Sequence, residues 1–214
     1  MKFIIRLWVC TLCGASNLYA AGLDSLATRA FHRFSTNLTL APAQVPFPVA
    51  AGANFYYIYD ARWMIGIDAN HSGTAIKILA SNVDAVQDTH VTLQAMRFFG
   101  NSFHVKMGLG QRYTGMRLTK DLFDPVKYKL YQPTSTFETL FFRTGIGNLW
   151  HFNNRYSLGL NWLTFNIPLK NTITESSARY ANTPDNATRI TDTEDIIGSF
   201  PSGSFLQLEL GMVF

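Results

Sequence analysis

Charged residues are scarce in this chain of 214 residues, because Lys, Arg, Asp and Glu together make up only 15% of it. A typical soluble domain carries about 25% charged residues. Aromatic residues, in contrast, make up 14% of the chain. So few charges beside so many aromatic residues exclude a disordered chain, a coiled coil and a strongly charged nucleic-acid-binding protein.

Long hydrophobic runs are also missing. After the first 20 residues there is no uninterrupted stretch of about 18 apolar residues, which excludes a transmembrane helix in that part of the chain. Hydrophobic residues nevertheless make up 47% of the sequence. A chain that is apolar without apolar blocks distributes its hydrophobic residues thinly, and alternation along β-strands is the usual way to do this.

Cysteine occurs only twice, as Cys10 and Cys13. Both lie in a segment with basic residues at its start, an apolar stretch, and then small residues that end at Ala20. This order predicts a secretory signal peptide over residues 1–20, with cleavage after Ala20. Neither cysteine follows a small residue, so we do not expect a lipid anchor. The mature chain, residues 21–214, is then free of thiols and of disulfides.

The net charge gives no sign of a nucleic-acid partner. The whole chain carries a formal charge of +4, and two of its basic residues, Lys2 and Arg6, belong to the signal peptide. The mature chain therefore has 16 basic residues against 14 acidic ones. A net charge this small does not match a protein that neutralises many phosphates.

Apolar and polar residues alternate along most of the mature chain, which predicts β-strands. The last eleven residues show this most clearly, because Leu206, Leu208, Leu210, Met212 and Phe214 share one face there. The pattern predicts eight strands in all. Their ranges are 31–40, 50–59, 62–70, 89–99, 103–113, 136–151, 155–162 and 204–214.

Short and long connections alternate between these strands. The short ones contain Asp60-Ala61, Gly100-Asn101 and Asn153-Asn154, and these residue types suit tight hairpins. The polar segment 168–203 is the longest connection, and we expect it to be a mobile surface loop. Outer-membrane barrels have this layout, with short periplasmic turns and long extracellular loops. The other long connections are residues 41–49, 71–88 and 114–135.

Aromatic residues bracket each short turn. Strand propensity alone would scatter them along the strands. At a membrane–water interface, in contrast, aromatic rings collect into a girdle. The sequence therefore predicts a periplasmic girdle made of Tyr59, Trp63, Phe99, Phe103, Trp150, Tyr156 and Phe214.

Alternation alone also fits a soluble barrel with an apolar interior. Here the less apolar faces of the strands carry many glycines beside a few charges, which suits a narrow interior better than a solvated surface. The sequence therefore favours the inverted arrangement, in which apolar side chains face lipid. Closure of the barrel would satisfy the backbone hydrogen bonds that hydrocarbon cannot.

The segment from Leu206 to Phe214 resembles the C-terminal assembly signal of bacterial outer-membrane barrels, which alternates and ends in Phe. With its eight strands, the chain is similar to the group that includes the OmpA membrane domain, OmpX, OmpW and the opacity proteins. The resemblance implies an all-β fold over residues 21–214, an eight-stranded antiparallel transmembrane barrel in the outer membrane of a Gram-negative bacterium. Its partners would be outer-membrane lipids and the barrel-assembly machinery, which would read the residues Leu206, Leu208, Leu210, Met212 and Phe214. We expect a monomer without cofactor or metal.

Six charged side chains face inward according to the alternation. Isolated buried charges are costly, so these side chains are expected to pair, and closure of the barrel would bring Arg33 beside Glu209. An eight-stranded barrel has room for side chains rather than for a channel, which favours a plugged lumen. An excess of basic residues, Lys106, Arg112 and Arg143, leaves open a weakly anion-attracting interior. The six are Arg33, Asp68, Lys106, Arg112, Arg143 and Glu209.

Arg97 is an exception to the alternation, because its position gives it the same face as apolar residues that should meet lipid. Close to a periplasmic turn, a long basic side chain can reach the headgroups at a cost of about 0–1 kcal/mol. The alternative is a strand bulge that turns Arg97 inward.

Three functions remain possible. The leading hypothesis is a non-enzymatic barrel with a structural or surface-interaction role and a largely plugged lumen. The resemblance to OmpW implies the alternative, passage or binding of a small or hydrophobic solute. The third is an enzyme acting on lipids, because Asp68, His71 and Ser72 lie near the end of one strand. Adjacent residues on a strand point to opposite faces, however, which argues against this catalytic set.

Overall fold

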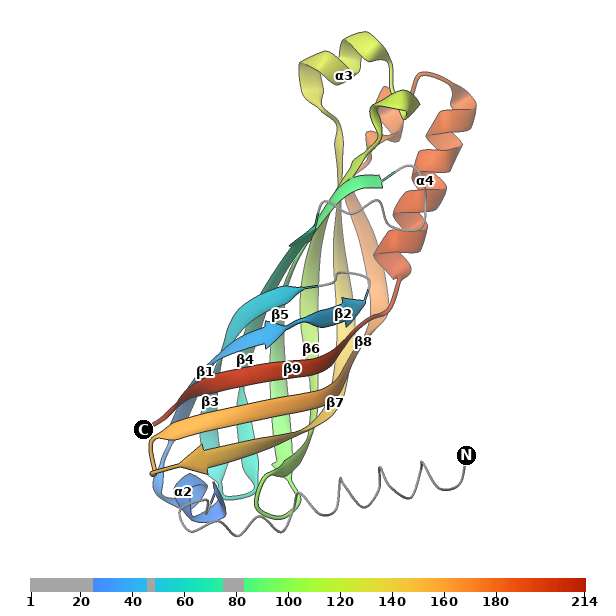
Figure 1. The fold of residues 1–214 in the computed structure, drawn as a ribbon. Helices are drawn as coiled ribbons and strands as arrows, with labels where there is room; N and C mark the ends of the chain where they lie inside the picture. The colour runs from blue at the N-terminus through green and yellow to red at the C-terminus, as the bar shows by residue number, and fades with distance from the viewer. Residues whose placement is uncertain (1–24, 46–48, 75–82) are drawn as a thin grey trace, which may run out of the picture.

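A computed structural model describes residues 25–45, 49–74 and 83–214. The predicted signal peptide, residues 1–20 with both cysteines, lies outside these described residues. Figure 1 shows the strands as a tall barrel with helices at both of its ends. The elements are α2 (Ser25–Phe31), β1 (Phe34–Ala41), β2 (Ala43–Val45), β3 (Ala50–Asp60), β4 (Trp63–Thr74), β5 (Val83–Phe98), β6 (Phe103–Leu118), η2 (Lys120–Leu122), α3 (Pro125–Tyr131), β7 (Thr134–Phe152), β8 (Tyr156–Glu175), η3 (Ser177–Tyr180), α4 (Pro184–Ser199) and β9 (Ser202–Val213).

The strands form one closed antiparallel ring. From β3 to β9 each strand pairs with the next, β1 pairs with β3, and β1 also pairs with β9 to close the barrel. The short β2 follows β1 after Pro42 and pairs with the same strand, β9. Proline has no N–H to give to the ladder, which accounts for the break between β1 and β2. Since β1 and β2 together form one interrupted strand beside β9, the wall has eight strands. The predicted eight-stranded antiparallel barrel is confirmed.

Four strands are much longer than the other four. β1, β3, β4 and β9 have 8, 11, 12 and 12 residues, close to the roughly 9–11 residues that cross a bilayer. β5, β6, β7 and β8 have 16, 16, 19 and 20 residues. In Figure 1 these four rise beyond the rest of the barrel, at the end opposite the C-terminus. The predicted ranges of these four strands were too short at this end, because a strand outside the membrane no longer needs an apolar outer face.

The expectation of a mobile loop over residues 168–203 is wrong, because most of this segment is regular structure. β8 continues to Glu175, and η3 and α4 follow. The sequence contains a helix start signal for α4, Thr183 followed by Pro184. In the structure, the Thr183 hydroxyl accepts a hydrogen bond from the Asn186 N–H, and Pro184 takes the first helical position. A hydrophobic cluster joins α4 to the inner side of the extended strands. It consists of Val83, Val86, Met116, Leu118, Leu122, Phe123, Phe137 and Ile190.

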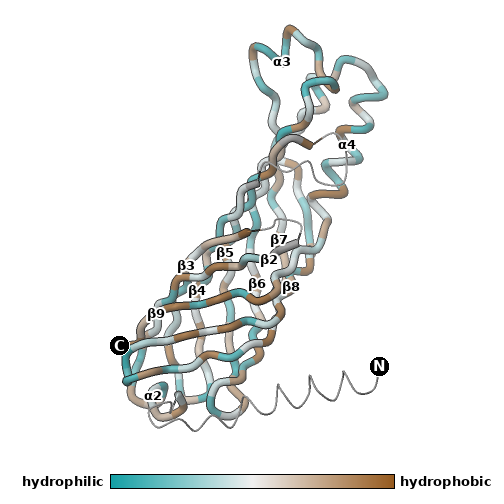
Figure 2. Tube along the Cα trace, viewed as in Figure 1, coloured by the Kyte–Doolittle hydropathy of each residue, from teal (hydrophilic) through white to brown (hydrophobic). Residues whose placement is uncertain are grey.

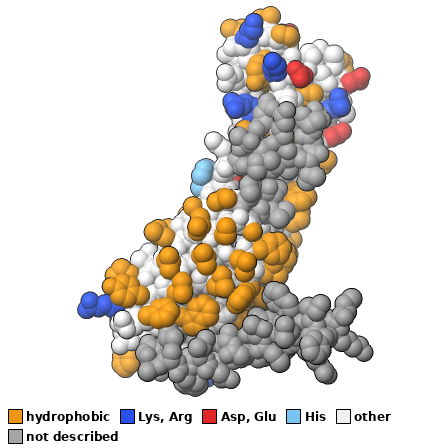
Figure 3. Space-filling model, in the orientation of Figure 1, with side chains coloured by type: hydrophobic (Ala, Val, Ile, Leu, Met, Phe, Trp, Pro, Cys, Tyr) orange, Lys and Arg blue, Asp and Glu red, His pale blue; other side chains and the backbone are white. Residues whose placement is uncertain are grey.

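The outer wall of the barrel is apolar. Outward-facing Leu38, Leu93 and Leu210 are 71%, 62% and 61% exposed, whereas their chain neighbours Asn37 and Glu209 are buried. Figure 2 shows hydrophobic and hydrophilic residues interspersed along the strands, and Figure 3 shows hydrophobic side chains gathered over the barrel wall. This apolar belt consists of Leu38, Leu40, Phe55, Tyr57, Ile65, Ile67, Val91, Leu93, Met107, Leu109, Leu140, Ile146, Phe165, Ile167, Leu208, Leu210 and Met212.

An apolar surface of this extent is far larger than soluble monomers expose. Around a closed ring without free strand edges, it belongs to a barrel that spans a membrane. Within the described part of the chain, no helix combines the length and hydrophobicity needed for a membrane span. The short turns, α2 and the C-terminus share one end of the barrel, which is the periplasmic end in this class of protein (Figure 1). The helices α3 and α4 then lie on the extracellular side.

Candidate functional site

The structure places five of the six predicted inward charges inside the barrel, each no more than 3% exposed. Arg33 is the exception, because it lies exposed at the bend before β1. The expected pair of Arg33 with Glu209 is therefore wrong. The prediction failed because β1 begins at Phe34, so the alternation of the strand does not extend to Arg33. The five inside are Asp68, Lys106, Arg112, Arg143 and Glu209.

Asp68 and Arg143 form an ion pair across the lumen. Asp68 lies on β4 and Arg143 on β7, and two further strands separate these in the wall. The Arg143 Nη1 donates to the Asp68 Oδ1 at 2.5 Å. The Arg143 Nε donates to the Asn166 Oδ1 at 2.7 Å, and the Asn70 amide donates to Asp68. This network therefore ties opposite sides of the barrel together.

A second pair, Lys106 and Glu209, also joins strands that are not neighbours, β6 and β9. The Lys106 Nζ lies 3.9 Å from the Glu209 Oε1. The Asn161 Nδ2 donates to the same carboxylate oxygen at 2.5 Å. Gly145 leaves the room that Lys106 occupies, because a Cβ at residue 145 would lie 3.1 Å from the Lys106 Cε.

Arg112 links the lumen to the extracellular helix α4. Its Nε lies 3.9 Å from the Asp88 Oδ1. Its two terminal nitrogens donate to the carbonyl oxygens of Gly198 at 3.0 Å and of Phe200 at 3.2 Å, at the C-terminal end of α4. A cation in this place also complements the helix dipole.

Asp88 is a further inward charge that was not predicted, because the expected strand began one residue later, at position 89. Asp88 is fully buried and accepts a hydrogen bond from the Thr114 hydroxyl at 3.0 Å. Counting the alternation one residue further back along β5 would have found it. With Asp88 inside and Arg33 outside, the described strands place Lys106, Arg112 and Arg143 against three carboxylates. On the strands, three cations therefore face three carboxylates, and the basic excess expected there is wrong.

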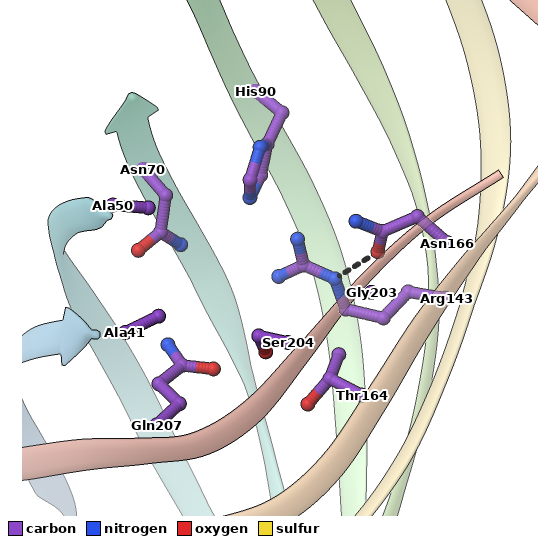
Figure 4. Close-up of a pocket in the computed structure, with 10 residues that line it drawn as sticks. All are labelled: Ala41, Ala50, Asn70, His90, Arg143, Thr164, Asn166, Gly203, Ser204 and Gln207. Carbon is purple, nitrogen blue, oxygen red and sulfur yellow. Dashed lines mark hydrogen bonds between the residues drawn. The ribbon is translucent and has the colours of Figure 1, made fainter. Parts of the chain in front are cut away.

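The space beside Arg143 is small. A cavity of about 10 Å³ lies beside Arg143, which is room for about one water molecule. In Figure 4 the side chains of Asn70, His90 and Gln207 extend toward this space from different strands. The lining residues are Ala41, Ala50, Asn70, His90, Arg143, Thr164, Asn166, Gly203, Ser204 and Gln207.

The periplasmic end of the lumen is covered by the helix α2, which sequence analysis did not predict. Arg29 of this helix is 1% exposed. Its Nε donates to the Ala61 carbonyl at 2.8 Å, and its guanidinium carbon lies 3.7 Å from the Phe98 ring centroid. The Ser25 hydroxyl accepts from the His151 N–H at 2.8 Å. Above α2 lies an apolar layer of Tyr56, Ile58, Met64, Met96, Phe98, Leu149 and Val213.

The residues of the predicted aromatic girdle lie where strands begin or end next to the short turns. Tyr59 lies near the end of β3 and Trp63 begins β4, for example. Two of the seven are half-buried, and the other five are exposed. The half-buried residues are Phe103 and Trp150, and the exposed ones are Tyr59, Trp63, Phe99, Tyr156 and Phe214.

The residues considered for lipid chemistry are not brought together. His71 is exposed and its Nδ1 lies 2.8 Å from the Thr89 hydroxyl, whereas Ser72 is buried on the opposite face of β4. Asp68 is held by Arg143. In the described ranges, no group of three or more His, Cys, Asp or Glu side chains could hold a metal ion.

No known protein family matches this chain, and no curated protein matches it. Among solved structures, the chain is similar to the N-terminal β-barrel domain of Pseudomonas aeruginosa OprF, with 9% sequence identity and a TM-score of 0.49 over 86% of this chain and 98% of that one. It is also similar to Ail, the attachment invasion locus protein of Yersinia pestis, with 8% identity and a TM-score of 0.42 over 85% of this chain and 97% of that one. For Ail in complex with the heparin analogue sucrose octasulfate, identity is 8% and the TM-score 0.43, over 85% and 97% of the two chains. By its own closed ring, apolar belt and short turns at one end, the chain is an integral outer-membrane β-barrel.

Proposed function

We propose that this barrel is a non-enzymatic outer-membrane protein with an occluded lumen, which holds a folded crown at the bacterial surface. The crown comprises η2, α3, η3, α4 and the ends of β5 to β8 that pack against them. The observation that carries the occluded lumen is the two ion pairs that cross it, Arg143–Asp68 and Lys106–Glu209. The three strand cations Lys106, Arg112 and Arg143 each have a carboxylate within 4 Å, and the cavity beside Arg143 is about 10 Å³.

A surface-interaction role is supported by the crown. It has a hydrophobic cluster of its own and therefore keeps a defined shape outside the membrane. At its tip, Val126, Leu130 and Tyr131 of α3 are 67%, 69% and 65% exposed. Figure 3 shows hydrophobic and basic side chains next to each other at this tip. Exposed apolar groups on an ordered scaffold are typical of surfaces that bind other molecules.

The purified barrel is expected to conduct no ions in planar lipid bilayers, because two ion pairs cross the lumen and the cavity beside Arg143 holds about one water molecule. Insertion is checked by the shift of the folded barrel in electrophoresis with and without heating. A variant with both Asp68→Ala and Arg143→Ala, which removes the central pair, serves as a control and is expected to leak. Reproducible conductance of the wild type, or uptake of a hydrophobic solute into liposomes that contain it, would contradict the proposal and support the OmpW-like passage.

We further propose that the barrel works as a monomer and that the assembly machinery reads its last strand. Leu206, Leu208, Leu210, Met212 and Phe214 all face outward there. The Phe214 carbonyl accepts from the Phe34 N–H at 2.8 Å, and the Phe214 N–H donates to the Phe34 carbonyl at 2.9 Å. The Phe214 ring contacts the Phe34 ring at a centroid distance of 6.0 Å but is 57% exposed, so it is accessible while its backbone closes the ring.

Phe214→Ala is expected to lower the yield of folded barrel in the outer membrane several-fold, because it removes the aromatic ring but keeps the backbone bonds to Phe34. The folded fraction is measured by heat-modifiable electrophoresis of membrane fractions. Phe205→Ala, on the same strand and also exposed, is the control. The stability of the purified Phe214→Ala protein should change by only about 0.5–1.5 kcal/mol, as expected for loss of an aromatic contact. Equal yields of the two variants would refute the assembly proposal.

A further inference from the structure

Arg97 is a cation on the lipid-facing side of the wall. Its side chain is exposed, and β5 pairs regularly with both neighbours here, as Trp63 with Arg97 and Arg97 with Val105. The alternative of a bulge that turns Arg97 inward is therefore wrong. Within the described residues, no carboxylate lies at ion-pair distance from Arg97. This contrasts with the three inward-facing cations of the strands, Lys106, Arg112 and Arg143, which each have a carboxylate within 4 Å.

Two aromatic rings hold the Arg97 side chain against the wall. Its guanidinium carbon lies 5.4 Å from the Trp63 ring centroid and 5.2 Å from the Phe99 ring centroid. Both distances are within the range of cation–π attraction. The turn between β5 and β6 follows directly, so the guanidinium lies at the periplasmic edge of the apolar belt. Lipid phosphates are found at this depth, and a basic side chain is tolerated there.

A groove extends from Arg97 into the apolar belt. Ala95, two residues earlier on β5, is paired with Ile65 on β4 and Met107 on β6, so a small side chain stands between two large ones. The resulting hollow has a volume of about 170 Å³. Its lining residues are Trp63, Ala95, Arg97, Phe99, Val105 and Met107, which supply an apolar floor with one cation at its end.

We propose that this groove binds one glycerophospholipid of the periplasmic leaflet. The lipid phosphodiester accepts hydrogen bonds from the Arg97 guanidinium, whose planar fork matches phosphate oxygens. The first part of an acyl chain lies over Ala95, between Val105 and Met107. A phosphate is the matching partner because the groove pairs an apolar floor with a cation that no described carboxylate neutralises. The site is on the outer wall and does not depend on the occluded lumen or the crown.

Native mass spectrometry of the detergent-solubilised mature barrel, titrated with phosphatidylglycerol, tests the cation. We expect the wild type to retain one lipid molecule. Arg97→Gln should weaken this binding about tenfold, because a charge-assisted hydrogen bond is lost. Arg62→Gln is the control, since Arg62 is an exposed cation at the same end that does not line the groove. Equal retention by the two variants overturns the proposal.

A second pair of variants tests the groove while Arg97 is kept. Ala95→Leu fills the hollow, whereas Ala53→Leu adds the same side chain to another outward position, on β3. We expect only Ala95→Leu to lose the retained lipid, and this pair decides the question if Arg97→Gln does not fold. Diacylglycerol, which lacks the phosphate, should bind about tenfold more weakly than phosphatidylglycerol. Equal binding of diacylglycerol, or displacement of the lipid by millimolar inorganic phosphate, overturns the assignment to a phospholipid.

Discussion

Arg143→Met is expected to lower the free energy of unfolding by about 3–5 kcal/mol, because it leaves the Asp68 carboxylate buried without its ion-pair partner. Asp68 is 0% exposed and its pair with Arg143 crosses the lumen. The Asn166 amide oxygen also loses a hydrogen bond from Arg143. The measurement is reversible unfolding of the barrel by denaturant in the presence of detergent or lipid.

The double variant Asp68→Asn with Arg143→Met separates the lost pair from the lost packing. It removes both charges, so we expect it to recover most of the stability that Arg143→Met loses. Arg62→Met, which replaces an exposed arginine, is the control and should change stability by less than about 0.5 kcal/mol. A loss below about 1 kcal/mol for Arg143→Met would mean that water, rather than Asp68, solvates this guanidinium in the folded protein.

Arg112→Met is expected to loosen the crown while the membrane-spanning wall stays intact. The substitution removes two hydrogen bonds from a guanidinium to the carbonyls of Gly198 and Phe200, and also the cation 3.9 Å from the buried Asp88 carboxylate near the extracellular end of β5. Hydrogen bonds to charged groups contribute about 1.5–3 kcal/mol each. We expect amide hydrogen exchange in residues 184–199 to become about 150-fold faster or more, which corresponds to about 3 kcal/mol, the lower bound for two such bonds.

Arg117→Met provides the control for this effect, because Arg117 lies on the same strand and is exposed. Exchange in β4 and β9 should not change in either variant. If residues 184–199 keep their protection in Arg112→Met, then the hydrophobic contacts of Ile190 alone hold α4 in place. In that case the hydrogen bonds of Arg112 to Gly198 and Phe200 do not contribute measurably to the stability of the crown.

The barrel itself could be predicted because the two faces of each spanning strand lie in different environments, lipid outside and a polar interior inside. Leu208 and Leu210 face outward while Glu209 between them is buried, which is the alternation that the sequence shows. The tight turns were also predictable, because Gly100, Asn153 and Asn154 have positive φ values of 88°, 51° and 54°. Residues of these types adopt that conformation most readily.

The errors lie where a strand leaves the membrane or where the chain leaves the wall. Arg33 lies inside the predicted strand 31–40 but precedes the first residue of β1. Asp88 lies before the predicted strand 89–99 but inside β5, which begins at Val83. The buried residues of α2 are polar, and α4 has few apolar residues. Their positions depend on partners from other strands, such as Phe98 for Arg29 and Phe137 for the cluster around Ile190. Short-range patterns do not contain such partners.

By itself, the sequence determined the number of strands, the ends at which they turn and the face that meets lipid, because all three follow from local alternation and turn chemistry. Only the tertiary structure decided which charges meet inside. Asp68 and Arg143 are 75 residues apart in the chain. Whether two such side chains lie at the same height depends on the tilt and stagger of the strands around the ring, which alternation along any one strand does not encode.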